Sequence, residues 1–227
     1  MKKRKGNYLL QRLIKKTILG ISLLLFTAGV AQTNVLKEFK LISFGEKLKF
    51  SNVNQNTDFK VVDLITKQEF FFHGNEINNY AFETPGSFEI TIKHDHIDNS
   101  EECEHNSLPE LLMLRVSPYK MEFDFSTLSF TKNIQSGVWL DNIELSVNIN
   151  FTSFDKTQAV FDQGQITTAG IGTTILGKLK NNSIVLLPGT NKLIYTISGS
   201  ATKETYIMFD FLDINSQIKS YNYPIKL

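Results

Sequence analysis

Apolar and polar residues alternate with a period of two along much of this chain. In SFEITIKH (87–94), Phe88, Ile90 and Ile92 alternate with polar side chains, and IELSVNINF (143–151) repeats the pattern. A period of two places every second side chain on the same face of an extended strand. Both segments are therefore predicted to be strands with one buried face.

Short runs rich in β-branched and aromatic residues continue the pattern between clusters of Asn, Gly, Pro and Ser. They predict further strands at 46–50, 58–65, 69–73, 80–84, 111–117, 121–125, 183–188, 192–198, 205–213 and 218–227. No segment after residue 31 shows the spacing of an amphipathic helix. The predicted fold class is all-β.

Two features divide the chain near its middle. VSPYK (116–120) carries a proline between two predicted strands and has the character of a linker, and Pro-Gly precedes a long strand in both halves, at 85–86 and 188–189. Many short strands with regularly spaced turns are typical of β-sandwiches. We therefore expect two tandem Ig-like β-sandwich domains, at 32–118 and 119–227; a single larger sandwich is the alternative.

The N-terminal segment has the composition of an export signal. Residues 1–16 carry seven basic residues, and the apolar run Thr17–Val30 leads to Ala31. This order is typical of a cleaved signal peptide at 1–31, and the run is shorter than the roughly 20 residues that span a bilayer. A retained transmembrane anchor is the alternative. We expect an exported protein in the periplasm, at the outer-membrane surface or outside the cell, with no membrane span after signal removal.

Charge limits the classes of partner that the chain can bind, and the cysteine count limits how the fold is stabilised. The chain has 24 basic and 23 acidic residues; because residues 1–31 hold seven basic and no acidic ones, their removal leaves 17 basic against 23 acidic. An acidic chain lacks the cationic surface that nucleic acids and anionic membranes require, so neither partner is expected. One cysteine cannot form an internal disulfide, so stability must come from packed cores.

KFSNVN (49–54), followed by YAFETPGSFEITI (80–92), resembles the PKD family of extracellular Ig-like domains. In that family an early Phe strand precedes a Tyr, a Pro-Gly corner and then alternating apolar residues; its central Trp-x-Phe-Gly-Asp-Gly stretch is missing here. With the signal and the Asn-, Lys- and Phe-rich composition, the chain is similar to secreted envelope proteins of the Bacteroidota. PKD-like domains act as spacers or binding modules, so the resemblance implies adhesion or assembly.

Three of the four histidines and the only cysteine fall within 94–105. His94 and His96, like Cys103 and His105, are two residues apart and on a strand would share a face. Imidazole and thiolate ligands suit zinc or copper, so these four residues form a candidate metal site. The alternative is an acidic solvated loop. The flanking Glu102 and Glu104 disfavour a thiolate, which argues against a cysteine nucleophile.

Three other segments have two interpretations each. The glycine-rich stretch 167–178 is either a phosphate-binding loop or a turn between strands. It lacks the glycine spacing of a phosphate-binding loop, so we predict a turn. Asp210, Asp213 and Asn215 either bind calcium or form a hairpin turn, which is the simpler explanation. Trp139, the only tryptophan, is interpreted as a core residue, with an exposed platform for sugar stacking as the alternative.

The sequence thus predicts a secreted, non-enzymatic interaction or assembly module of the cell envelope, without catalytic residues or a cofactor. Its partner is expected to be another envelope or surface protein, bound through an exposed strand edge. The segment 218–227 is the predicted edge, because Pro224 cannot donate to a ladder. A zinc- or copper-binding protein and a carbohydrate-binding module are the alternatives.

Overall fold

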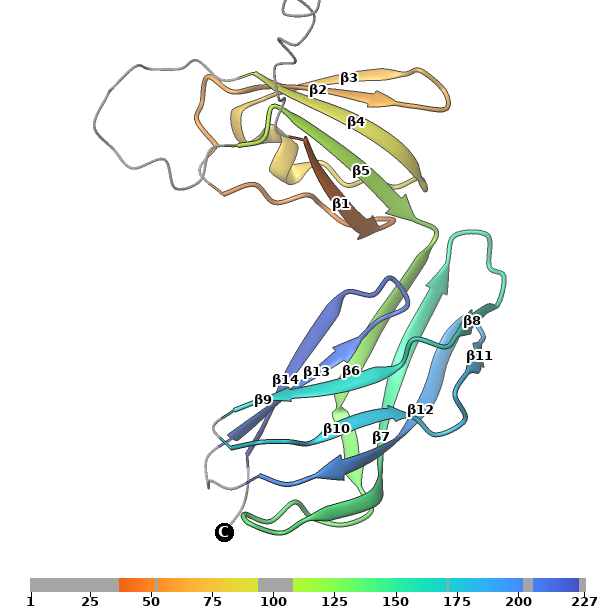
Figure 1. Cartoon of the computed structure of the whole chain (residues 1–227). Coiled ribbons are helices and arrows are strands. Elements are labelled where there is room, and N and C mark those ends of the chain that lie inside the picture. Colours follow the sequence, from red (N-terminus) through yellow and green to blue (C-terminus); the bar gives the residue numbers. More distant parts are fainter. Residues whose placement is uncertain (1–36, 52, 94–107, 171, 202–205, 225–227) are drawn as a thin grey trace, which may run out of the picture. The chain divides into compact units, whose positions relative to one another are not determined.

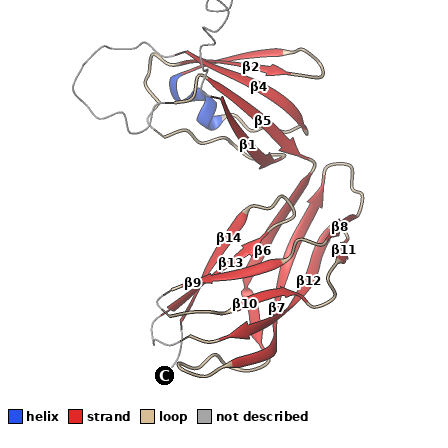
Figure 2. Ribbon diagram, viewed as in Figure 1, coloured by secondary structure: helices blue, strands red, loops and turns tan. Residues whose placement is uncertain are grey.

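The computed structural model describes residues 37–51, 53–93, 108–170, 172–201 and 206–224 (Figure 1). Two large β-sheets and a two-stranded sheet make up this part of the chain, and one short 3-10 helix, η1 (Gly74–Asn79), interrupts the strands (Figure 2). The predicted all-β class is confirmed. The signal peptide predicted at 1–31 lies outside the described residues.

The first large sheet has the strand order β1-β5-β4-β2-β3. Its strands are β1 (Lys37–Ser43), β2 (Asp58–Asp63), β3 (Glu69–His73), β4 (Gly86–Lys93) and β5 (Leu111–Ser117). β1 pairs with β5 in parallel, from Lys37 opposite Leu111 to Ser43 opposite Ser117, whereas the other pairs are antiparallel. The predicted strands at 69–73 and 111–117 match β3 and β5.

One face of this sheet is buried because its strands alternate as the sequence predicts. Phe88, Ile90 and Ile92 of β4 are buried, while the polar residues between them face the other side. The buried face is covered by apolar side chains from the segments between strands, chiefly Leu48, Phe50, Ile77 and Phe82.

Two predicted strands of this region, 46–50 and 80–84, are wrong. Only a single bridge between Lys47 and Ala81 joins them. Leu48, Phe50 and Phe82 are nevertheless buried. Burial of irregular chain produces the same apolar pattern as a strand, which explains the error.

The second large sheet has the order β14-β13-β9-β10-β12-β7-β6, with every neighbouring pair antiparallel. Its strands are β6 (Tyr119–Phe130), β7 (Leu140–Ser153), β9 (Gln165–Ala169), β10 (Leu176–Leu179), β12 (Gly189–Gly199), β13 (Tyr206–Leu212) and β14 (Ile218–Pro224). β8 (Ala159–Phe161) and β11 (Ile184–Leu186) form the separate two-stranded sheet.

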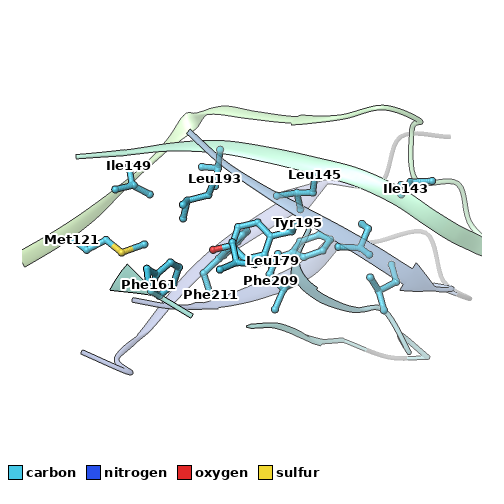
Figure 3. Packing of buried hydrophobic residues seen from close by; sticks show 14 of the residues in the cluster. Met121, Ile143, Leu145, Ile149, Phe161, Leu179, Leu193, Tyr195, Phe209 and Phe211 are labelled. Atoms are coloured by element: carbon cyan, nitrogen blue, oxygen red, sulfur yellow. The ribbon is translucent and has the colours of Figure 1, made fainter. Parts of the chain in front are cut away.

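The core of the second sheet lies inside the curled sheet (Figure 3). Leu145 and Ile149 of β7 pack in one cluster with Leu193 and Tyr195 of β12 and with Phe211 of β13. The two end strands also meet through their side chains, since the rings of Phe125 in β6 and Tyr221 in β14 stack at 5.1 Å. The sheet therefore bends back on itself and encloses its own core.

Strands β1, β8, β9 and β10 are not predicted from the sequence. The glycine-rich stretch 167–178, interpreted as a turn, contains the β9–β10 turn and parts of both strands. Position 177 in β10 is occupied by glycine because a larger residue would not fit there. An added Cβ would approach the Ile197 side chain to 2.6 Å. A strand glycine that marks close packing is a known use of this residue.

The predicted linker VSPYK is not a free segment. β5 ends at Ser117 and β6 begins at Tyr119, so only Pro118 lies between them. The two hydrophobic clusters share no residue, since one comprises residues from 42–116 and the other from 119–223. Residues 37–227 form one compact unit, and the division into domains at 118 stays a prediction.

Candidate interaction edge

The last strand of the second sheet, β14, lies at the sheet's edge. It pairs with β13 on one side, from Leu212 opposite Ile218 to Tyr206 opposite Pro224, and has no strand neighbour on the other side among the described residues. The edge position expected from Pro224 is therefore confirmed for 218–224. Residues 225–227 lie outside the described part.

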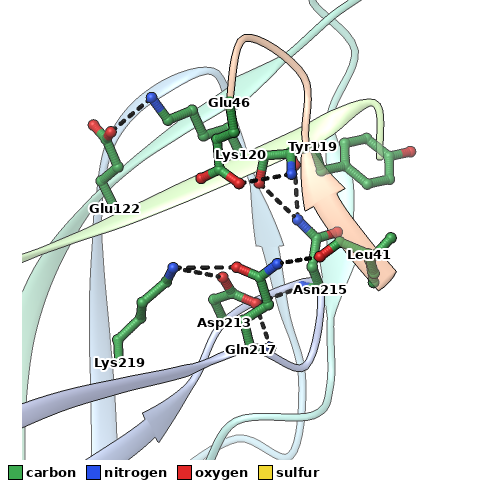
Figure 4. A network of polar contacts seen from close by, with 10 residues as sticks. Leu41, Glu46, Tyr119, Lys120, Glu122, Asp213, Asn215, Gln217 and Lys219 are labelled. Atoms are coloured by element: carbon green, nitrogen blue, oxygen red, sulfur yellow. Dashed lines mark hydrogen bonds and ion pairs between the residues drawn. The ribbon is translucent and has the colours of Figure 1, made fainter. Parts of the chain in front are cut away.

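The turn that leads into β14 is organised by Asp213 (Figure 4). Its Oδ1 accepts hydrogen bonds from the backbone N–H groups of Asn215 and Gln217, both at 2.8 Å, and Lys219 Nζ lies 3.7 Å from Oδ2. The Asp213 side chain is 1 % exposed, and burial raises the pKa of its carboxyl. The predicted hairpin turn is confirmed. The N–H groups of Asn215 and Gln217 bind Asp213 Oδ1, an oxygen of the carboxylate that was the alternative calcium ligand.

The turn also fixes which backbone groups of β14 face outward. Asp213 N donates to the carbonyl oxygen of Gln217 at 2.9 Å. Since hydrogen-bonded and non-hydrogen-bonded pairs alternate in an antiparallel ladder, residues 219, 221 and 223 direct their N–H and C=O groups toward β13. Residues 218, 220 and 222 therefore direct theirs away from the sheet, as does the carbonyl of Pro224.

Side chains on β14 alternate in the same way. Tyr221 and Tyr223 are half-buried; Tyr221 stacks on Phe125, and Tyr223 packs edge-on against Phe130 at 4.8 Å. Both rings therefore pack against the opposite end strand of the sheet, β6. The four exposed side chains are uncharged: Ile218, Ser220, Asn222 and Pro224. Ile218 is 63 % exposed.

The other edge strands of the two large sheets, β1, β3 and β6, carry features that block the addition of another strand, namely charged side chains and irregular backbone. β1 exposes Lys37 and Glu38. β3 begins at Glu69, which forms an ion pair with Lys60 at 2.7 Å.

The second edge of the seven-stranded sheet, β6, combines both features. Lys120 and Glu122 form an ion pair at 2.8 Å, and the register with β7 shifts between Asp124 and Ser129. In the described part of the chain, β14 is thus the large-sheet edge whose most exposed side chains carry no charge, and its one charged residue, Lys219, lies beside the buried Asp213 carboxyl.

The turn before β14 is held by hydrogen bonds to β1 and to the first residue of β6. Asn215 Nδ2 donates to Ser43 Oγ at 3.1 Å and to the carbonyl of Tyr119 at 2.9 Å. Gln217 Nε2 donates to the carbonyl of Leu41 at 2.7 Å (Figure 4). These bonds fix the turn and so order the first residue of the edge.

The candidate metal ligands His94, His96, Cys103 and His105 lie outside the described residues. The remaining histidine, His73, forms a 2.7 Å contact from Nδ1 to Asp58 Oδ1, beside a groove of about 430 Å³ that Phe71 and Lys93 also line. Within the described ranges, no group of three or more His, Cys, Asp or Glu side chains is placed to hold a metal. Zinc or copper binding stays a prediction.

Trp139 is not a core residue, so the preferred interpretation of its role is wrong. Its side chain is 64 % exposed in the turn before β7, and the adjacent Val138 is 46 % exposed. The core position next to it is filled by Leu140, which is 4 % exposed. The exposed-platform alternative is compatible with this geometry.

Comparisons of the chain with protein-family models, curated proteins and solved structures give no match. In the described ranges, no helix has the length and apolar character needed to cross a bilayer.

Proposed function

We propose that this protein is a secreted, non-enzymatic interaction module of the cell envelope that binds an envelope or surface protein by strand addition at β14. The observation that carries the proposal is the edge itself: seven residues, outward backbone groups at 218, 220 and 222, and a single charged residue, Lys219, whose Nζ lies 3.7 Å from Asp213 Oδ2. An incoming strand would satisfy these groups by main-chain hydrogen bonds, the mode by which extended peptides join exposed sheet edges.

The proposed protein has a two-domain architecture and lies outside the cytosol. Two tandem Ig-like sandwiches, at 32–118 and 119–227, would follow a signal peptide cleaved after Ala31. The two separate hydrophobic clusters support this division, as does the resemblance of the first half to PKD-like domains. The acidic balance left by signal removal is compatible with a protein rather than a nucleic-acid partner.

The proposed binding edge is tested by Ser220→Pro with Ser220→Ala as its matched control. Both variants lose the hydroxyl and its 2.6 Å hydrogen bond to Asp210 Oδ1, but only proline also loses the outward N–H. In native gels of the envelope fraction, the wild-type chain and Ser220→Ala should migrate in a high-mass complex. Ser220→Pro should migrate as free protein, and its retention in the complex would exclude β14 as the binding edge.

The compartment is tested separately, by N-terminal sequencing of the protein recovered from the producing cells. A chain that begins at Gln32 and fractionates outside the inner membrane supports export. A chain that keeps residues 1–31 and stays in the cytosol contradicts it.

Carbohydrate binding is a second candidate function, favoured by the exposure of Trp139. An accessible indole face can stack on a sugar ring as other aromatic faces stack on planar or apolar ligands. On a glycan array, Trp139→Ala should abolish any signal. Phe71→Ala is the matched control, since Phe71 is similarly exposed, at 70 %, but lies in the other large sheet. An array without signal, or equal loss in both variants, rules this candidate out.

A further inference from the structure

We infer that the strand which β14 accepts is the β14 strand of a second copy of this chain, paired antiparallel about a two-fold axis at Ser220. This deepens the proposed function and rests on it. The inference follows from the positions of the outward backbone groups, the side chains that would face each other, and the position of Pro224.

The backbone groups of the edge are self-complementary. A two-fold axis at Ser220 places Ile218 opposite Asn222 of the second copy, Ser220 opposite its own equivalent and Asn222 opposite Ile218. All three are outward-facing positions, so each pair can form the two reciprocal hydrogen bonds of an antiparallel ladder. An isologous interface of this kind uses the same surface on both copies and closes at the dimer.

Pro224 selects this register over its neighbour. An axis at Tyr221 would place Ile218 opposite Pro224, where the Ile218 carbonyl would face a residue without an N–H. With the axis at Ser220, Pro224 lies beyond the paired residues, and every N–H and C=O at 218, 220 and 222 has a partner. The proline then ends the pairing.

The charges of the edge are compatible with a second copy. Lys219 is the only charged residue of β14. In this register it lies opposite Tyr221 of the second copy, so no like charges face each other, which would destabilise a cross-strand pair.

Disulfide trapping tests the register. The experiment uses chain purified from the producing cells in a Cys103→Ser background, oxidised with copper phenanthroline. Cα atoms of a hydrogen-bonded antiparallel pair are about 5.5 Å apart, within the roughly 4.4–6.8 Å that a disulfide spans. Ser220→Cys should therefore give a covalent dimer.

Asn222→Cys is the matched control, on the same strand and likewise exposed to solvent. Its equivalent on the second copy would be four residues away along the strand, about 14 Å, so this variant should remain monomeric. Crosslinking of Tyr221→Cys without Ser220→Cys would overturn the register, and equal crosslinking of Ser220→Cys and Asn222→Cys would indicate random collision and overturn the dimer.

Sedimentation velocity over a concentration series measures dimer formation without any engineered cysteine. The wild-type chain and Ser220→Ala should shift toward twice the monomer mass as concentration rises, and Ser220→Pro should stay monomeric. A wild-type chain that stays monomeric up to its solubility limit overturns the dimer. If envelope complexes still depend on the Ser220 N–H in that case, the proposed function holds with a different partner strand.

Discussion

At the scale of single residues, the core of the second sheet contains a phenol that the packing does not satisfy. Tyr195 is fully buried, and its hydroxyl has no hydrogen-bond partner among the described residues. The ring contacts Phe211 edge-on at 5.8 Å. An unsatisfied buried hydroxyl costs free energy, which the ring's burial offsets.

Tyr195→Phe should therefore leave the free energy of unfolding unchanged or raise it by up to about 1 kcal/mol, because it removes the desolvated hydroxyl and keeps the ring. Tyr195→Ala should lower it by about 3–5 kcal/mol through loss of the ring. Urea unfolding monitored by circular dichroism measures both changes. A clear loss of stability in Tyr195→Phe would mean that the hydroxyl is hydrogen-bonded.

Asp213 gives a pH-dependent prediction. Because burial raises the pKa of its carboxyl in the folded chain, the folded state favours the neutral form. The stabilisation from this group is complete below its unfolded pKa, near 4, and is lost as pH rises through the folded value.

Asp213→Asn removes this titration while keeping an oxygen to accept from Asn215 and Gln217 N–H. The stability of the variant relative to wild type should accordingly rise as pH increases from about 4 toward 7. Unfolding free energies measured across that range provide the check. A difference that is constant with pH would contradict the raised pKa.

Trp139 allows a spectroscopic prediction about the native chain. With its side chain 64 % exposed, the only tryptophan should show a red-shifted emission maximum, and iodide should quench it in the folded protein nearly as strongly as in urea. Blue-shifted emission that iodide does not quench would place the indole in a protected environment.

At the scale of elements, one glycine sets the geometry of a long strand. Gly199 ends β12 at a register irregularity with β7, and its φ is 130°. An added Cβ would approach the carbonyl oxygen of Thr174 to 2.5 Å. Both the backbone angle and the close approach require glycine there.

Gly199→Ala should therefore destabilise the chain by about 2–4 kcal/mol. Gly137→Ala is the control: φ is also positive, at 72°, but no atom lies within 4 Å of the added Cβ, so only about 1–2 kcal/mol should be lost. Thermal or urea unfolding compares the two variants. Equal losses would show that the contact with Thr174 does not matter.

Elements with strong alternation are predictable from the sequence, and the others fail for identifiable reasons. β4 and β7 follow from their period-two patterns, and β5 follows from its apolar run at 111–117. β1 is missed because its pattern is masked by Lys37, Glu38 and Lys40, and because its partner is distant in sequence. Residues 46–50 are misassigned because their apolar side chains fill the core without joining a ladder.

The edge itself is partly predictable. Pro224 indicates an edge strand from sequence alone. That the backbone N–H and C=O groups of residues 218, 220 and 222 point away from the sheet follows only from the Asp213–Gln217 hydrogen bond. Trp139 is misassigned because hydrophobicity does not tell which of two adjacent apolar residues, Trp139 or Leu140, enters the core.

At the scale of the whole molecule, the two hydrophobic clusters predict separable unfolding. Ile90 belongs to the first cluster and Ile149 to the second, and both are at most 1 % exposed. Truncation of either to alanine should cost about 2–5 kcal/mol. Ile90→Ala should weaken amide protection chiefly in 37–117, and Ile149→Ala chiefly in 119–224.

Native-state hydrogen exchange measures this prediction, because it reports local stability segment by segment. If both substitutions lower protection equally in the two sheets, residues 37–224 unfold as one cooperative unit, and the single-sandwich alternative gains support over the two-domain proposal.

The parallel pairing of β1 with β5 has a consequence for biogenesis. Lys37 pairs with Leu111 and Ser43 with Ser117, so the first strand to emerge from the ribosome or translocon must wait for the last strand of its sheet. At about 5–20 residues per second, this delay lasts several seconds, during which Leu41 and Ile42, half-buried and buried in the folded sheet, lack their cover. Nascent β1 is therefore the segment on which a holding chaperone would act before the first sheet can close.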